Sequence, residues 1–355
     1  MPHETVNTHD LKFNQRFRYG TFQVLDHFIG RARVNKMIGK RRYALQQGIL
    51  KTLKEKGPAK LKPIDRRKDL SLKDFIREYV KPGIPVVLEG AALEWECCKK
   101  WSMDYFRDLH GDDEIVMVDQ SQIANAFEKT TLRDVIDNIS SGGSKYYRFY
   151  PLLERHPEHI LDFDYKWLQE RKYGFSMAES FQVFIGGKGT ETPIHNASAP
   201  NLFVQSYGEK HWVLYTNYHT PIIDPAPVRN IYRSAPIRSN YYFNPFDEKP
   251  DYKTYPCYEF IEGYEVFLKK GDVLWNPPFV WHTIKNTSDS IGVGYRWFAP
   301  FYSWKLSPLY AILDLFARKP PIWKSIKLMK MDMNLVHLAE TGRLDEYMKS
   351  VEKKK

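Results

Sequence analysis

The fold is decided by two stretches, FQVFIGGKGTETPIHNASAPNLFVQSYGEKHWVLYT at residues 181–216 and GDVLWNPPFVWHTIKNTSDSIGVGYRW at residues 271–297. In both stretches apolar and polar residues alternate with a period of two, and glycines mark the turns between the alternating runs. This pattern is typical of antiparallel strands joined by turns. We therefore predict a mainly β fold with flanking helices, in which the strands close into a jelly-roll barrel.

Helical patterns lie on both sides of this barrel. Apolar residues recur at three- and four-residue spacing in residues 22–38 and 43–56, and a linker with Gly57, Pro58 and Pro63 follows. We predict a basic helical N-terminal extension and linker at 1–63, the barrel domain at 64–303, and a C-terminal helical extension at 304–355. The segment 217–260 is too long for a simple hairpin, so we expect it to cover a substrate pocket.

Charge and cysteine content limit the class of protein. The formal net charge is +10, concentrated in residues 31–69 and 317–355. Such basic ends fit an acidic partner, nucleic acid or an anionic membrane, but a solvated basic face is the favoured interpretation, and the evidence for nucleic acid or membrane is not strong. The three cysteines form no metal-binding pair, and no long apolar run is present, so we expect a cytoplasmic protein.

Two histidines and one lysine are the candidates for chemistry. His195 follows the turn from Gly187 to Pro193, and His282 follows a Pro-Pro turn, so we predict both at strand beginnings near one rim. Alternation places Lys210 on one strand face with Trp212 and Leu214. A lysine that points into a barrel needs an anion, such as a dicarboxylate, because an unpaired buried ammonium is costly. The alternative is that Lys210 reaches outward to water.

The chain resembles the JmjC-type, cupin-like Fe(II)/2-oxoglutarate oxygenases, the group that includes the asparaginyl hydroxylase of hypoxia-inducible factor. The resemblance runs from about Asp65 to Phe301. It rests on G-T-x-T-P-x-H-x-x-x-x-x-N-L-x-x-Q-x-x-G-x-K-x-W-x-L in the first stretch and G-D-x-L-x-x-P-x-x-x-W-H in the second. It implies a double-stranded β-helix core and oxidation of an aliphatic C–H bond.

The resemblance also implies roles for individual residues. His195 and His282 would bind Fe(II), while Lys210 and Thr192 would bind the distal carboxylate of 2-oxoglutarate. Asn201 matches a polar position of the co-substrate pocket. One of three tyrosines would add a hydroxyl to that pocket, and of Tyr146, Tyr147 and Tyr150 we choose Tyr147. Arg296 either reaches the pocket from its strand or forms a structural ion pair.

One position departs from the family pattern. The family carries H-x-D, and here the third residue is Ala197, whose methyl group cannot bind a metal. Water or chloride could fill that place, so the resemblance leaves hydroxylation and chlorination open, as in halogenases that have alanine or glycine there. A nearby group could also substitute, and the candidates are Glu191, Asn196 and Ser198. A non-catalytic cupin-like binding or scaffold protein is the alternative. The substrate, whether a small molecule or a peptide or protein, stays open. The apolar face of the C-terminal helices, with Leu309, Ile312, Leu313 and Phe316, suits either the core or a homodimer seam.

Overall fold

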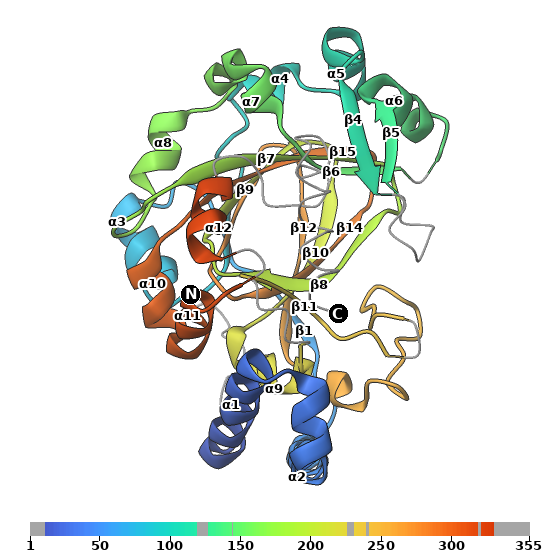
Figure 1. The fold of residues 1–355 in the computed structure, drawn as a ribbon. Coiled ribbons are helices and arrows are strands. Elements are labelled where there is room, and N and C mark those ends of the chain that lie inside the picture. Colours follow the sequence, from blue (N-terminus) through green and yellow to red (C-terminus); the bar gives the residue numbers. More distant parts are fainter. Residues whose placement is uncertain are drawn as a thin grey trace.

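Two sheets face each other and enclose the interior of the barrel (Figure 1). The computed structural model describes residues 11–118, 127–143, 145–225, 231–238, 241–318 and 321–329. The first sheet has the strand order β1 (Leu61–Pro63), β12 (Gly263–Leu268), β10 (Lys210–Tyr215), β14 (Trp281–Asn286), β8 (Glu191–Ala197) and β11 (Tyr232–Ser234). The second has the order β2 (Arg66–Arg67), β3 (Val86–Leu88), β13 (Val273–Asn276), β9 (Asn201–Tyr207), β15 (Ser290–Trp297), β7 (Glu179–Gly186) and β6 (Tyr146–Tyr150).

Consecutive strands of the barrel alternate between the two sheets, except that β10 and β12 both lie in the first sheet. Strands β7, β9, β13 and β15 belong to the second sheet, and β8, β10, β12 and β14 belong to the first. All pairings among these eight strands are antiparallel. This arrangement confirms the predicted jelly-roll core with helical flanks, a double-stranded β-helix.

The interior of the barrel is filled by side chains from both sheets. Trp212 and Leu214 of β10 lie in this cluster with Phe203 of β9 and Phe184 of β7. Glycines make room for them: a Cβ atom at Gly292 of β15 would lie 2.4 Å from Cζ of Phe203 and 3.2 Å from Cε of Lys210. The inner face of β15 therefore depends on the absence of a side chain at this position.

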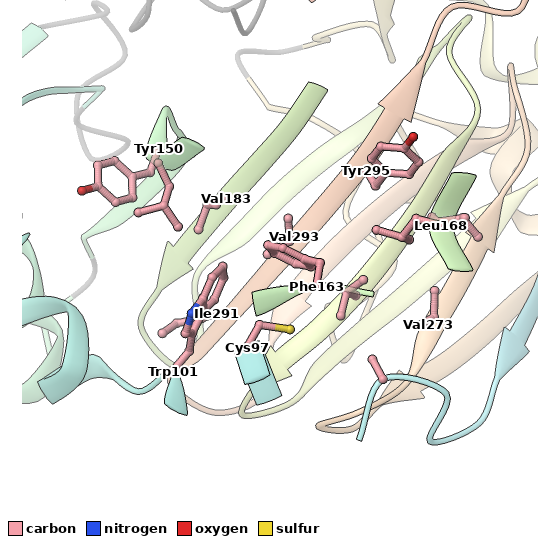
Figure 2. Packing of buried hydrophobic residues seen from close by; sticks show 14 of the residues in the cluster. Cys97, Trp101, Tyr150, Phe163, Leu168, Val183, Val273, Ile291, Val293 and Tyr295 are labelled. Atoms are coloured by element: carbon pink, nitrogen blue, oxygen red, sulfur yellow. The ribbon is translucent and has the colours of Figure 1, made fainter. Parts of the chain in front are cut away.

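The outer face of the second sheet carries the largest apolar cluster. Val183, Ile291, Val293 and Tyr295 project from the sheet toward covering helices, as Figure 2 shows. The covering elements are α3 (Leu72–Phe75), η1 (Ile76–Val80), α4 (Glu96–Lys100), α5 (Met103–His110), α6 (Leu132–Ser140), α7 (Leu152–Arg155), η2 (Pro157–Asp162) and α8 (Tyr165–Glu170), with the hairpin β4 (Glu114–Val118) and β5 (Phe127–Thr131) beside them.

Helix starts in this layer follow the capping signals in the sequence. The Ser71 hydroxyl accepts a hydrogen bond from the backbone N–H of Asp74 at the start of α3. Thr131 and Asp134 form a reciprocal capping box at the start of α6. Both contacts satisfy backbone donors that the first helical turn leaves without a partner.

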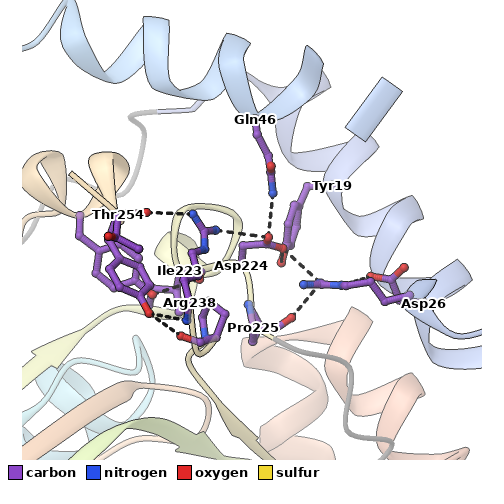
Figure 3. Close-up of polar contacts among 12 residues, drawn as sticks. Tyr19, Asp26, Gln46, Ile223, Asp224, Pro225, Arg238 and Thr254 are labelled. Atoms are coloured by element: carbon purple, nitrogen blue, oxygen red, sulfur yellow. Dashed lines mark hydrogen bonds and ion pairs between the residues drawn. The ribbon is translucent and has the colours of Figure 1, made fainter. Parts of the chain in front are cut away.

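The N-terminal helices are bound to the barrel by a cluster of ion pairs. Helices α1 (Phe13–Phe28) and α2 (Arg31–Lys54) lie against α9 (Thr220–Ile223), η3 (Asn217–His219) and η4 (Pro256–Phe260). Asp224 accepts hydrogen bonds from Tyr19, Arg31 and Gln46, so one carboxylate joins both helices to the segment after α9 (Figure 3). The helical pattern at 22–38 is interrupted because Gly30 adopts a φ of +102°, which lies outside the helical region.

The C-terminal part described by the structure is also helical. Helices α10 (Pro300–Leu306), α11 (Pro308–Leu315) and α12 (Ile322–Met329) follow β15. Leu313 is buried against Phe279 and Tyr310, whereas Ile312 and Phe316 are 39% and 52% exposed. The predicted apolar face is thus divided between core and surface. Among the described residues, no helix is long and apolar enough to cross a membrane.

Candidate active site

The two candidate histidines meet on adjacent antiparallel strands. His195 of β8 is the direct register partner of His282 of β14, and the centroids of their rings lie 4.2 Å apart. His282 is near the start of its strand, as predicted, but His195 is near the end of β8. The prediction that both lie at strand beginnings is wrong for His195. They still share one rim, because in an antiparallel pair the end of one strand adjoins the start of the other.

Backbone carbonyls fix the protonation of both imidazoles. Nδ1 of His195 lies 2.8 Å from the carbonyl oxygen of Pro193, and Nδ1 of His282 lies 3.0 Å from that of Val280. A carbonyl oxygen only accepts, so each Nδ1 is assigned as the donor, and in the neutral imidazole Nε2 then carries the lone pair. Nε2 of His282 is buried and has no hydrogen-bond partner among the described residues. This is the arrangement in which metal-binding histidines are oriented by a second hydrogen bond.

Burial keeps both imidazoles neutral. It lowers the pKa of His195 to about 4. Burial, together with the neighbouring His195, lowers the pKa of His282 well below its usual value. A neutral imidazole is the form that binds a metal, so at neutral pH no proton has to leave before binding.

Lys210 is buried at the start of β10. Its side chain is fully inaccessible, and its ammonium donates hydrogen bonds to Oδ1 of Asn286 and, over 2.9 Å, to Oγ of Ser290. Burial lowers the pKa of Lys210 to about 7. Neither partner carries a charge, so a bound anion would supply the counter-charge that these two partners do not give the buried ammonium.

His195, His282 and Lys210 line the same cavity, which has a volume of about 230 Å³. Both sheets contribute to its wall, and the predicted long segment supplies Tyr232, Ser234 and Tyr242. The remaining lining residues are Tyr146, Arg148, Phe184, Thr192, Pro193, Phe203, Trp212, Ile284 and Arg296. Thr192 therefore lies in the wall of the same cavity as Lys210.

The cavity wall is rich in positive charge. Arg148, Lys210 and Arg296 line it, and no carboxylate is among its described lining residues. Nε of Arg148 and Nε of Arg296 are buried without a hydrogen-bond partner among the described residues. Such a set of cations without counter-charges is suited to an anionic ligand.

One predicted pocket residue, Tyr147, is placed elsewhere. Tyr147 packs in the apolar cluster on the outer face of the second sheet, while Tyr146 lines the cavity. The reason is strand alternation, which sends neighbours on β6 to opposite faces. Asn201 is 2% exposed and lies next to Arg296 on the adjacent strand, but it is not one of the cavity-lining residues.

Ala197 occupies the place where a carboxylate ligand would be expected. Its register partner is Tyr232, and His195 two residues earlier has Ser234 as its partner. Within the described ranges, no group of three or more His, Cys, Asp or Glu residues could hold a metal ion. The described residues thus supply two imidazole ligands, and no third His, Cys, Asp or Glu among them joins the pair.

Arg148 belongs to no motif that singles it out in the sequence, and for Arg296 the sequence allows either the pocket or a structural ion pair; both line the cavity. Both could have been found from alternation, since Arg148 is two residues from Tyr146 and Arg296 is two residues from Gly294 on strands that face the interior. Whether a carboxylate lies near these two arginines depends on how distant segments pack, and no local sequence pattern predicts this.

The fold and this pair of histidines define a cupin-type barrel with a candidate metal centre. The chain belongs to the cupin-like domain family, whose pattern matches residues 72–303. It is similar to lysine-specific demethylase JMJ30 of Arabidopsis thaliana, at 24% identity over 66% of this chain and 55% of that protein. It is also similar to lysine-specific demethylase 8 of Xenopus tropicalis, at 27% identity over 64% of this chain and 51% of that protein.

A human relative is matched over more of its length. The bifunctional peptidase and (3S)-lysyl hydroxylase JMJD7 is 23% identical over 68% of this chain and 84% of that protein. The chain spans about half the length of the two demethylases, so the similarity covers only part of those proteins. The chain is thus a member of the cupin-like domain family that is similar in sequence to these JmjC-named proteins.

Proposed function

We propose that this chain is an Fe(II)- and 2-oxoglutarate-dependent oxygenase that oxidises an aliphatic C–H bond of its substrate. The observation that carries the proposal is the pair of neutral imidazoles, His195 and His282, in the same buried cavity as Lys210. Two histidines on neighbouring strands are the protein nitrogen ligands of non-haem Fe(II) oxygenase sites. The names of the relatives, which include demethylases and a lysyl hydroxylase, support the same class of reaction.

The residues present fit the metal in part. His195 and His282 would hold it through Nε2, the atom that the Nδ1 contacts leave with a lone pair. Trp212 stacks on His282 with 5.5 Å between ring centroids and limits the positions of the imidazole. No third His, Cys, Asp or Glu ligand joins the two histidines in the described part of the chain, so water or an added anion would complete the site.

The residues fit a dicarboxylate co-substrate well. Lys210 would bind its distal carboxylate, with Thr192 and Tyr146 beside it in the wall. Nζ of Lys210 lies 5.6 Å from the ring centre of Tyr146, which places the phenol and the ammonium at one end of the cavity. Apolar side chains of Phe203, Trp212 and Ile284 exclude water from this end. When bound, the metal and 2-oxoglutarate supply the O2-dependent oxidation, and the protein positions them.

The outcome of the oxidation depends on what completes the metal site beside Ala197. A carboxylate or water would favour hydroxylation, whereas chloride would allow chlorination. We carry both outcomes forward. The substrate is a small molecule or a peptide or protein side chain, and the relatives named for lysine chemistry support the latter. A cytoplasmic location and a homodimer through the C-terminal helices are further parts of this proposal.

A non-catalytic cupin-like binding protein is the second candidate. It is favoured by the lack of a described third ligand at the two histidines. It also accounts for a charged cavity, since a binding protein for an anion needs Lys210 as much as an enzyme does.

A metal titration with a matched histidine control separates these candidates. Anaerobic Mn(II) or Fe(II) titration should give micromolar affinity in the wild type and loss of binding in His195→Ala and His282→Ala. His211→Ala is the control, because His211 lies on the opposite face of β10 from Lys210 and contacts Phe267 and Glu265. Turnover of 2-oxoglutarate with O2 is then measured with and without chloride. Metal binding without any turnover would favour the binding protein, and no metal binding would refute the oxygenase.

A further inference from the structure

The side chain of Ala197 faces the cavity. In an antiparallel pair, directly opposed residues project to the same face of the sheet. Ala197 opposes Tyr232, and Tyr232 lines the cavity together with Ser234 and His195 of the same paired strands. A ligand that took the place of the missing carboxylate would therefore lie on the side of the two imidazoles.

Arg296 reaches this place from the opposite sheet. It belongs to β15, but its Nη1 donates a hydrogen bond of 3.2 Å to the hydroxyl of Tyr232 on β11. The guanidinium side chain lines the same cavity as His195 and His282. The positive group thus lies at the end of the cavity where the chain lacks a negative one.

Asn201 adds a second unused polar group beside Arg296. The two residues are register partners on β9 and β15. Asn201 is 2% exposed, and neither its amide nitrogen nor its amide oxygen has a hydrogen-bond partner among the described residues. Gly294 leaves space between them, since a Cβ atom there would lie 3.1 Å from Oδ1 of Asn201 and 3.4 Å from Nε of Arg296.

Of the three other arginines that are buried in the described part of the chain, two have a carboxylate partner, and the third, Arg171, lies over the ring of Trp167. Arg233 is paired with Asp314, and Arg42 is paired with Asp26. No ion pair to a carboxylate is found for Arg296 within the described part of the chain, although only 5% of the residue is exposed. A buried charge without a counter-charge is costly, so an unpaired arginine beside an unpaired amide points to a ligand that supplies the anion.

We propose that Arg296, Asn201 and Tyr232 form a carboxylate-binding subsite that completes the two-histidine centre at the position of Ala197. A carboxylate fits because it accepts two parallel hydrogen bonds from a guanidinium and leaves lone pairs for the amide and for a metal. This subsite is separate from Lys210, whose partners Asn286 and Ser290 mark the other anion position. The inference rests on the proposed oxygenase function and extends it: the substrate, or a small co-ligand, carries a carboxylate.

The test is the effect of acetate on Co(II) affinity in protein saturated with 2-oxoglutarate, at constant ionic strength. Acetate should tighten Co(II) binding in the wild type by at least about tenfold, the range expected for a ligand-supporting contact. Acetamide, which is neutral, should have no effect. Arg296→Gln should abolish the acetate effect, and Arg148→Gln, which removes the other cavity arginine, should retain it. Ala197→Asp should bind Co(II) tightly without acetate and respond to acetate no further.

Each other outcome overturns the subsite. An equal effect of chloride would make it a halide site, and an acetate effect that survives Arg296→Gln would place the anion elsewhere. An acetate effect that is seen in a parallel titration without 2-oxoglutarate, but is absent in the saturated protein, would assign Arg296 to the co-substrate. Titration of candidate acidic substrates in the same assay distinguishes a substrate carboxylate from a free co-ligand, since only the former would bind more tightly than acetate.

A metal-free measurement keeps this proposal distinct from the proposed function. Acetate should raise the melting temperature of the metal-free wild type and of Lys210→Met, but not that of Arg296→Gln. If Co(II) binds under no condition, the oxygenase proposal fails, and the metal-free comparison still decides the subsite. Absence of any acetate stabilisation in the metal-free wild type, together with absence of an effect on Co(II), would refute the subsite.

Discussion

His195 and His282 lie directly opposite each other on β8 and β14, with 4.2 Å between their ring centroids. Their strands are neighbours in the first sheet, and β10 with Lys210 pairs with the other edge of β14. Three strands from distant parts of the chain thus present the two nitrogen ligands and the ammonium to one cavity. The position of Lys210 in this set leads to a prediction about pH.

Binding of 2-oxoglutarate should weaken as pH rises above 7. Burial lowers the pKa of Lys210 to about 7 in the free protein. A bound anion favours the ammonium, so the pKa rises on binding and the complex takes up a proton. Below pH 7 the lysine is already protonated and affinity should be nearly constant. Above pH 7 affinity should fall by up to about tenfold per pH unit, which calorimetry over pH 6–9 can measure.

Lys210→Met provides the control for this pH dependence. Its residual affinity for 2-oxoglutarate should be low and should vary little between pH 6 and 9. A wild-type affinity that stays constant up to pH 9 would contradict the assignment of Lys210 as the anion-binding group.

Gly292→Ala should block the co-substrate end of the cavity. The added Cβ would lie 2.4 Å from Cζ of Phe203 and 3.2 Å from Cε of Lys210, so the ring and the lysine must move. We expect a loss of about 1–3 kcal/mol in the free energy of unfolding, typical of overpacking. Affinity for 2-oxoglutarate should fall at least about tenfold, since the ammonium is displaced.

Gly48→Ala is the matched control for that substitution. Gly48 lies inside α2, and the nearest atom to an added Cβ is 4.0 Å away. Alanine should stabilise the helix by up to about 1 kcal/mol and leave co-substrate affinity unchanged. Equal behaviour of the two variants in urea unfolding and ligand titration would show that Gly292 does not shape the cavity.

The sequence predicted much of this site because its signals are local. Alternation along β10 is enough to group Lys210 with Trp212, and a Ser or Thr before an acidic residue is enough to begin a helix. The choice of Tyr147 over Tyr146 failed because the phase of β6 depends on which face the covering helices occupy. Which face each tyrosine takes is set by tertiary packing, and the aromatic run at 146–150 does not determine it by itself.

The histidines of the covering layer were also outside the reach of local reasoning. His156 and His159 are expected at a helix end on the surface, but His159 is 4% exposed. Its Nε2 lies 2.7 Å from Nε2 of His110, and its Nδ1 lies 2.7 Å from Oδ2 of Asp162. Because His110 is 49 residues away in the sequence, no spacing rule connects the two.

This histidine cluster should make the protein sensitive to mild acid. Burial, with the adjacent His156 and His159, lowers the pKa of His110 to about 4. The unfolded chain then binds a proton more readily than the folded one, so stability is full above pH 6.5 and decreases as pH falls toward 4. Urea unfolding between pH 7 and 4.5 should show a less steep loss in His110→Gln than in the wild type. An unchanged slope would exclude His110 as a contributor.

Arg296→Met should stabilise the metal-free protein, in contrast to Arg233→Met. Arg233 pairs with Asp314 and lies over the ring of Tyr310, so its removal leaves a buried carboxylate alone and should cost about 3–5 kcal/mol. Arg296 is equally buried, but no described carboxylate neutralises it, so replacing it with an apolar side chain should raise the free energy of unfolding by about 1–3 kcal/mol. Chemical denaturation of the two variants without ligand measures both effects. Destabilisation by Arg296→Met would mean that this guanidinium already has a partner in the folded chain, and the charge would then be structural. If Arg296 is kept for its ligand, Arg296→Met should both stabilise the free protein and lose acetate binding. The reason is that a buried cation which weakens the free fold is retained only where a bound anion offsets its cost.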